Sequence, residues 1–164
     1  AALWLHPAAS NAAFLNAQET THTLVQAYLS GVKQLRNVRL GGPLGLKEQG
    51  IRPLDPIMAH SGMGMDFLIA NIEGLRALLV ESDFEKSISE GEAPRSIVQS
   101  VVVELDMTDS RVREIAKSSP DPFHTARSQL MALGWSLRNV HEAFLGAMAK
   151  AAGFSVGFNS LDGD

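Results

Sequence analysis

The fold of this chain is decided by residues 121–154, which read DPFHTARSQLMALGWSLRNVHEAFLGAMAKAAGF. Apolar residues recur in this segment at alternating steps of three and four, the spacing that places side chains along one side of an α-helix. They are Phe123, Ala126, Leu130, Leu133, Leu137, Val140, Phe144, Ala147 and Ala151. Asp121 is expected to cap the helix, with Pro122 at its favoured first position. The segment predicts one long amphipathic helix over about 121–153.

A second segment, about 11–39, carries the same spacing. Its repeated positions are Phe14, Ala17, Thr21, Leu24, Tyr28, Leu35 and Val38, with Gly31 between them. The hydroxyl of Ser10 can accept from free backbone N–H groups at the start. The sequence Gly-Gly-Pro at 41–43 ends the pattern. We therefore expect an all-α helical bundle built on two long amphipathic helices.

Three or four shorter helices are expected besides these two. Residues 40–60 are broken by proline and glycine but stay apolar, which predicts an irregular connector packed over the core. Residues 63–81 have helical spacing and a wide apolar side, which predicts a largely buried helix. Gly74 lies inside that pattern and suggests that a second helix approaches closely there. Ser82 can cap a short helix after it.

Residues 94–107 allow two interpretations. Pro94 favours the first turn of a helix, whereas the run 97–105 is rich in β-branched residues and favours a strand. We favour the helix, because the chain offers no convincing partner strand. Thr108 and Asp109 can cap a further short helix.

The composition indicates one ordinary globular domain over residues 1–164, with 45% hydrophobic residues. The chain has no cysteine, which excludes disulfides, thiolate nucleophiles and cysteine-bound metals. The formal charge of −4 disfavours a general nucleic-acid role. There is no run of 18 apolar residues, so we expect no membrane span and a soluble chain. The start lacks both Met and the basic region of a signal peptide; processing, if it occurred, would favour export or organelle import.

The charges are unevenly distributed. Acids predominate between Asp66 and Glu92, and bases predominate between Lys33 and Arg52. One interpretation is two solvated surfaces. The other is a pair of complementary patches that steer self-association.

Motifs for catalysis, for phosphate or dinucleotide binding and for metal ligation do not stand out in the sequence. Glu19 and His22 form a Glu-x-x-His pair, but a di-metal site would need a second copy and two further carboxylates. His141 lies one step from the apolar positions and is expected to be a structural histidine. We therefore expect neither a metal nor a cofactor.

The candidate binding residues fall into two groups. Three methionines with glycines and an aromatic residue near position 60 can form an adaptable apolar wall, and the last long helix carries aromatic residues. The eight candidates are Met58, His60, Met63, Met65, Phe67, Trp135, His141 and Phe144.

Three hypotheses about function follow. The first is a non-enzymatic helical protein that binds a partner chain or itself through an extended apolar helix face. The second is a carrier of a lipophilic small molecule, such as a lipid, hormone or pigment, in a pocket between helices. The third is an enzyme that uses His22 with Glu19, or His141, as an acid–base group.

Overall fold

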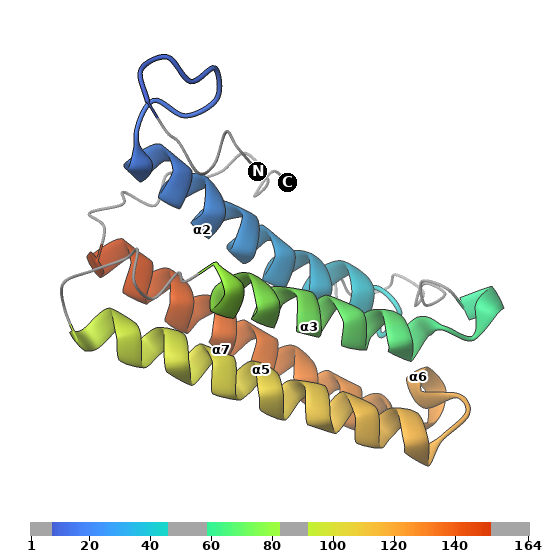
Figure 1. Ribbon diagram of the computed structural model, residues 1–164. Helices are drawn as coiled ribbons and strands as arrows, with labels where there is room; N and C mark the ends of the chain where they lie inside the picture. Colours follow the sequence, from blue (N-terminus) through green and yellow to red (C-terminus); the bar gives the residue numbers. More distant parts are fainter. Residues whose placement is uncertain (1–7, 46–58, 83–91, 152–164) are drawn as a thin grey trace.

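The computed structural model describes residues 8–45, 59–82 and 92–151, and within them every regular element is a helix. In chain order these elements are α2 (Ala17–Gln34), the π-helix η1 (Leu35–Leu40), the 3₁₀ turn η2 (Ala59–Ser61), α3 (Gly64–Glu81), α5 (Glu92–Ser118), α6 (Pro122–Thr125) and α7 (Arg127–Ala151). The long helices α2, α3, α5 and α7 lie side by side, and each runs in the direction opposite to the one before it in the chain (Figure 1). The all-α bundle expected from the sequence is confirmed.

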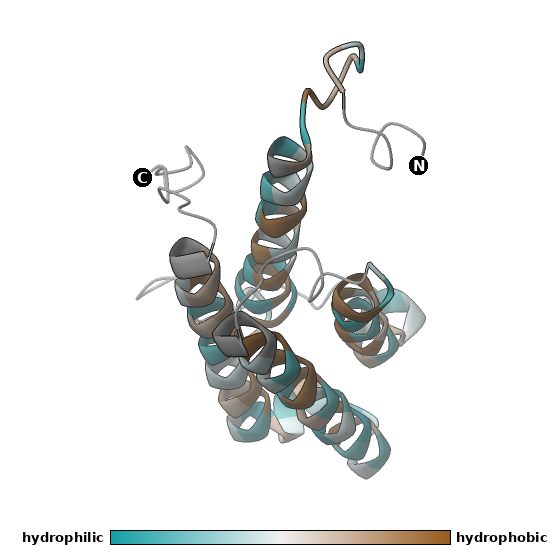
Figure 2. Cartoon of the chain, turned by 60° about the vertical axis from the view of Figure 1, so that its left-hand side comes forward, coloured by the Kyte–Doolittle hydropathy of each residue, from teal (hydrophilic) through white to brown (hydrophobic). Residues whose placement is uncertain are grey.

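The most extensive helix–helix contact in the bundle is between α5 and α7. α5 packs against both α7 and α3, and α2 with η1 packs against α7. Figure 2 shows that hydrophobic and hydrophilic residues alternate along each helix, as they do in amphipathic helices. None of the helices within the described ranges is long and apolar enough to cross a membrane.

The apolar positions that predicted the last helix form the centre of the core. Eight of the nine are buried, and the ninth, Ala151, has no described side chain. The helix is not continuous, however, because Ala126 leaves helical geometry with φ −113° and ψ 28°. The break separates α6 from α7 and allows the adjacent residues Pro122 and Phe123 both to be buried. The carboxylate of Asp121, expected to cap the helix, is hydrogen-bonded to His124 instead, with 2.9 Å between Oδ1 and Nδ1.

The first long helix starts later than predicted, and its buried side is only partly the predicted one. Tyr28 and Leu35 are buried as expected, but Ala17 and Val38 are exposed, and Val25, Leu29 and Val32 are buried in addition. Asn16 caps α2, and its Oδ1 accepts from the N–H of Glu19 at 2.9 Å. The expectation that Ser10 caps a helix from residue 11 is wrong. Asn11 is the cause, because its Oδ1 accepts from the N–H groups of Ala13 and Phe14 at 2.8 and 3.1 Å, and this local turn replaces the first turns of a helix.

The other end of that helix widens into η1. The N–H of Gly41 donates to the carbonyl of Arg36, five residues earlier, at 2.8 Å. The chain then turns through buried residues to Gly45, whose φ is +64°. Leu44 is fully buried, and its carbonyl accepts a hydrogen bond from Arg127 at the start of α7. The predicted apolar connector is thus confirmed for residues 41–45, and residues 46–58 lie outside the described part.

α3 matches the helix predicted over 63–81, but the role assigned to Gly74 is wrong. A Cβ built on Gly74 would meet nothing within 4 Å, whereas one on Gly31 would come within 2.9 Å of Leu75 Cδ2. Gly31 is therefore the residue that lets α2 approach α3. The short helix expected after Ser82 lies outside the described residues.

α5 is one helix of 27 residues, which confirms the helical interpretation of 94–107 and corrects the separate helix expected from Thr108. Thr108 is fully buried, and its Oγ1 donates to the carbonyl of Glu104 at 2.7 Å. The hydroxyl is therefore satisfied inside the helix and caps no new one. The β-branched run is helical because it supplies one continuous buried side. That buried side of α5 consists of Val98, Val101, Leu105, Thr108, Val112 and Ile115.

Candidate functional site

The eight candidate residues do not form one site. His60 and Met63 are exposed before α3, whereas Met65 is buried on the core side of that helix. Phe67 is half-buried and lies under the guanidinium of Arg39, 5.0 Å from the ring centre. Met58 lies outside the described residues. The methionines whose side chains are described point in different directions and do not make a single wall.

The three candidates on α7 differ in how far they are buried. Phe144 is fully buried, and its ring lies 4.4 Å from the ring of Tyr28 on α2. His141 is half-buried beside the buried Val140. Trp135, by contrast, is 62% exposed. Of the three, Trp135 alone presents most of its surface to solvent.

Glu19, the acid of the Glu-x-x-His pair, hydrogen-bonds to the backbone at the start of α2. Glu19 Oε2 accepts from the backbone N–H of Leu15 at 2.8 Å, which completes a capping arrangement with Asn16. The described ranges contain no group of three or more metal-ligating side chains. Glu19 therefore serves the helix terminus in this structure.

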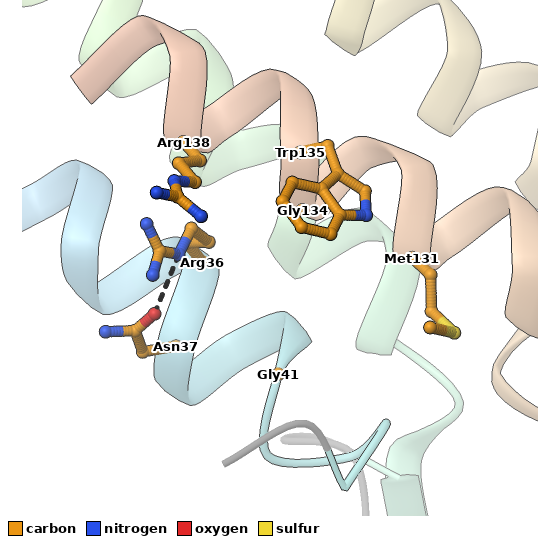
Figure 3. A pocket seen from close by; sticks show the side chains of 7 residues that line it. All are labelled: Arg36, Asn37, Gly41, Met131, Gly134, Trp135 and Arg138. Atoms are coloured by element: carbon orange, nitrogen blue, oxygen red, sulfur yellow. Dashed lines mark hydrogen bonds between the residues drawn. The ribbon is translucent and has the colours of Figure 1, made fainter. Parts of the chain in front are cut away.

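Trp135 borders an open groove between η1 and α7. The groove encloses about 250 Å³ and is lined by Arg36, Asn37, Gly41, Met131, Gly134, Trp135 and Arg138 (Figure 3). Met131, Trp135 and Arg138 are spaced by four and three residues, so they lie on one side of α7. This side is distinct from the core side, which carries Leu130, Leu133 and Leu137.

Two glycines shape the groove. Gly134 lies over Leu40, since a Cβ added to it would be 3.7 Å from Leu40 Cδ2. Gly41 lies against the backbone of η1, because an added Cβ would come within 2.9 Å of the carbonyl oxygens of Arg36 and Asn37. The π-helix and its glycine exit therefore bring the chain close to α7 with little side-chain bulk between them.

Two guanidinium groups lie near each other at one end of the groove (Figure 3). Arg36 Nε donates to Asn37 Oδ1 at 2.9 Å. Arg138 Nε donates to Glu142 Oε1 at 2.7 Å, and its guanidinium lies 5.7 Å from the Trp135 ring centre. The hydrogen bond from Arg138 lowers the pKa of Glu142, with a smaller contribution from the charge of Arg36. The groove is therefore apolar along α7 and positive at one end.

Sequence reasoning found Trp135 but missed the residues around it. Met131 and Arg138 could have been found from the same helical spacing, read on the side of α7 opposite the core. Arg36, Asn37 and Gly41 carry no such signal, because their place depends on how η1 packs against α7.

The chain was compared with models of protein families, with curated proteins and with solved structures, and none of the three comparisons gave a match.

Proposed function

We propose that this chain is a non-enzymatic helical protein that binds another protein chain, or a second copy of itself, through the groove between η1 and α7. The observation that carries the proposal is Trp135, a large apolar side chain held 62% exposed at the edge of the groove. Met131 also keeps a large exposed fraction, and Val38 on η1 is exposed as well.

The composition of the groove supports a protein partner. Trp, Met and Arg are enriched in protein–protein interfaces, and Trp and Arg dominate the residues whose truncation weakens binding most. Trp135, Met131, Arg36 and Arg138 supply these types within one groove. Burying the exposed part of an indole and a thioether would provide the apolar centre of an interface.

The size of the groove favours an anchoring side chain over a large free ligand. Pockets for drug-sized ligands usually enclose about 300–1,000 Å³ and bury most of the ligand surface. This groove holds about 250 Å³ and is open on one side. It accommodates one or two side chains of a partner, whose remaining contacts would extend along α7.

The test is capture of a partner by three immobilised forms of the chain: wild type, Trp135→Ala and Leu15→Ala. Leu15 is a matched control, because it is 58% exposed and lies before α2, away from the groove. Both substitutions remove an exposed apolar side chain, so each is expected to change the free energy of unfolding by less than about 0.5 kcal/mol. Extract from the organism that makes the protein is passed over each, and the retained species are quantified by mass spectrometry.

The proposal expects a protein retained in stoichiometric amount by wild type and by Leu15→Ala and lost from Trp135→Ala. Equal retention by all three forms would contradict it. An organic extract of the purified chain is measured in parallel. A lipophilic compound present at one equivalent, with no protein partner, would overturn the proposal in favour of a carrier.

A further inference from the structure

The two sides of the bundle carry opposite charge. α2, η1 and α7 together contain six Lys and Arg residues and two acids, whereas α3 and α5 contain eight acids and five bases. The helices α2, η1 and α7 therefore carry an excess of positive charge in a chain whose formal net charge is −4. Opposed charges of this kind on one molecule orient the approach of a second molecule.

The negative side has its own groove, between α3 and α5. It encloses about 310 Å³, and its lining includes four acids, Glu73, Glu81, Asp106 and Asp109, with Arg76 as the single base. Ion pairs of Arg76 with Asp106 and of Arg113 with Glu73 connect the two helices, and Arg113 also pairs with Asp109. This surface is therefore fixed by contacts across both helices and keeps an excess of acids over bases. We call it the acidic face.

Apolar side chains stand beside these acids. Val80 lines the groove and is about half exposed, next to the exposed Glu81. Val103 lies one turn before Asp106 on α5 and is 57% exposed. The acidic face therefore combines carboxylates with exposed apolar groups. The η1–α7 groove combines guanidinium groups with an exposed indole in the same way.

From these two surfaces we infer that the occupant of the η1–α7 groove is the acidic face of a second copy of this chain. The inference rests on the proposed function and names its partner. In this contact the carboxylates of one copy meet Arg36 and Arg138 of the other, and an apolar side chain such as Val80 covers Trp135. Charge complementarity on both sides selects this partner.

The contact is head-to-tail. If two copies paired groove to groove about a two-fold axis, the guanidinium end of each groove would meet the apolar end of the other, and the groove lining offers no acid to Arg36 and Arg138. Pairing of groove with acidic face brings carboxylates to these guanidinium groups. It also leaves one free groove and one free acidic face on every dimer, so further copies add until a ring closes or a filament forms.

The test uses the full chain and two variants, Trp135→Glu in the groove and Val80→Lys in the acidic face. Each places a charge where it would meet like charge from the second copy, at a position that is exposed in the free chain. Sedimentation equilibrium measures association up to about 1 mM protein, a range that detects weak contacts. Thermal unfolding followed by circular dichroism confirms that the variants remain folded, and Leu15→Glu serves as the matched control.

The expected result has three parts. Wild type and Leu15→Glu associate beyond the dimer as concentration rises, and the association weakens between about 0.05 M and about 0.5 M salt. Each of the other variants alone associates at least about tenfold more weakly. An equimolar mixture of Trp135→Glu and Val80→Lys regains association, because the intact groove of one variant meets the intact acidic face of the other and the two introduced charges are opposite in sign.

A monomeric wild type at the highest concentration would overturn this inference and leave the proposed function standing, because Trp135-dependent capture of a different protein is measured separately. A mixture no larger than its components would also overturn it. So would a wild-type dimer that neither adds further copies nor responds to Val80→Lys, since that result indicates groove-to-groove pairing.

Discussion

The hydroxyl of Tyr28 provides the sharpest test of the packing between α2 and α7. Tyr28 is 1% exposed, and its ring contacts the buried ring of Phe144. Its Oη is buried and finds no hydrogen-bond partner among the residues that the structure describes. In the unfolded chain the same hydroxyl bonds to water, so folding leaves one polar group unsatisfied. Such a group costs about 1–3 kcal/mol.

Replacing Tyr28 by Phe removes that cost and keeps the ring. We expect Tyr28→Phe to raise the free energy of unfolding by about 1 kcal/mol and Tm by about 2–4 °C for a domain of this size. Urea denaturation followed by circular dichroism measures the change, and an unaltered slope against urea shows that the native and unfolded states are otherwise comparable. Phe144→Leu is the control. It leaves the hydroxyl in place but loses the ring pair, so it is expected to lower stability, by about 0.5–1.5 kcal/mol for the pair alone.

Burial also raises the pKa of Tyr28 above its usual range, and this has a consequence at alkaline pH. The folded-state pKa of the hydroxyl is higher than its unfolded-state pKa, because the buried phenol resists ionisation. The free energy of unfolding is therefore unaffected by the ionisation of this group below the unfolded-state pKa and falls as the pH rises above about 10. Wild type should therefore lose more stability than Tyr28→Phe across that range. The reasoning is refuted if Tyr28→Phe is less stable than wild type by about 1 kcal/mol or more at neutral pH, since the hydroxyl would then have a partner.

Two further predictions concern the groove. Gly41→Ala should destabilise by about 1–3 kcal/mol, because its Cβ would press on two carbonyl oxygens of η1, whereas Gly134→Ala has room and should stabilise by up to about 1 kcal/mol. If urea denaturation gave the same change in the free energy of unfolding for both substitutions, the different space available to a Cβ at Gly41 and at Gly134 would not explain their effects. The hydrogen bond from Arg138 lowers the pKa of Glu142, so the stability it contributes is present at neutral pH and is lost as the carboxylate protonates. Glu142→Gln should therefore be less stable than wild type at neutral pH, and the difference should shrink as the pH falls below the usual pKa of Glu; a difference that does not change with pH would show that the carboxylate charge plays no part.

Much of the fold could be predicted because a helix repeats its exposure every three to four residues. The core side of α7 and the extent of α3 follow from that repeat, whereas the helical state of residues 94–107 was favoured because the chain offers no convincing partner strand. Boundaries were less predictable, because competing local hydrogen bonds decide them. Asn11 holds a turn where the sequence predicts a helix capped by Ser10, and the hydroxyl of Thr108 donates within α5 and starts no new helix.

The candidate site was predictable only in part. Trp135 is recognisable as a large apolar residue off the core side of its helix. Periodicity cannot show that Arg36 arrives beside it, because that depends on the widening of η1 and on its packing against α7. For the same reason the sequence predicts close helix approach at Gly74, whereas the structure shows it at Gly31, where an added Cβ would meet Leu75.

The sequence by itself determined that this protein is a bundle of amphipathic helices and which side of α3 and of α7 is buried. Helical periodicity is a local property and is written directly in the spacing of apolar residues. The tertiary structure alone decided which helices are neighbours, and therefore which apolar and charged side chains remain uncovered together. Neighbours are chosen by the fit of whole surfaces, so the groove beside Trp135 and the acidic face exist only once the helices have packed.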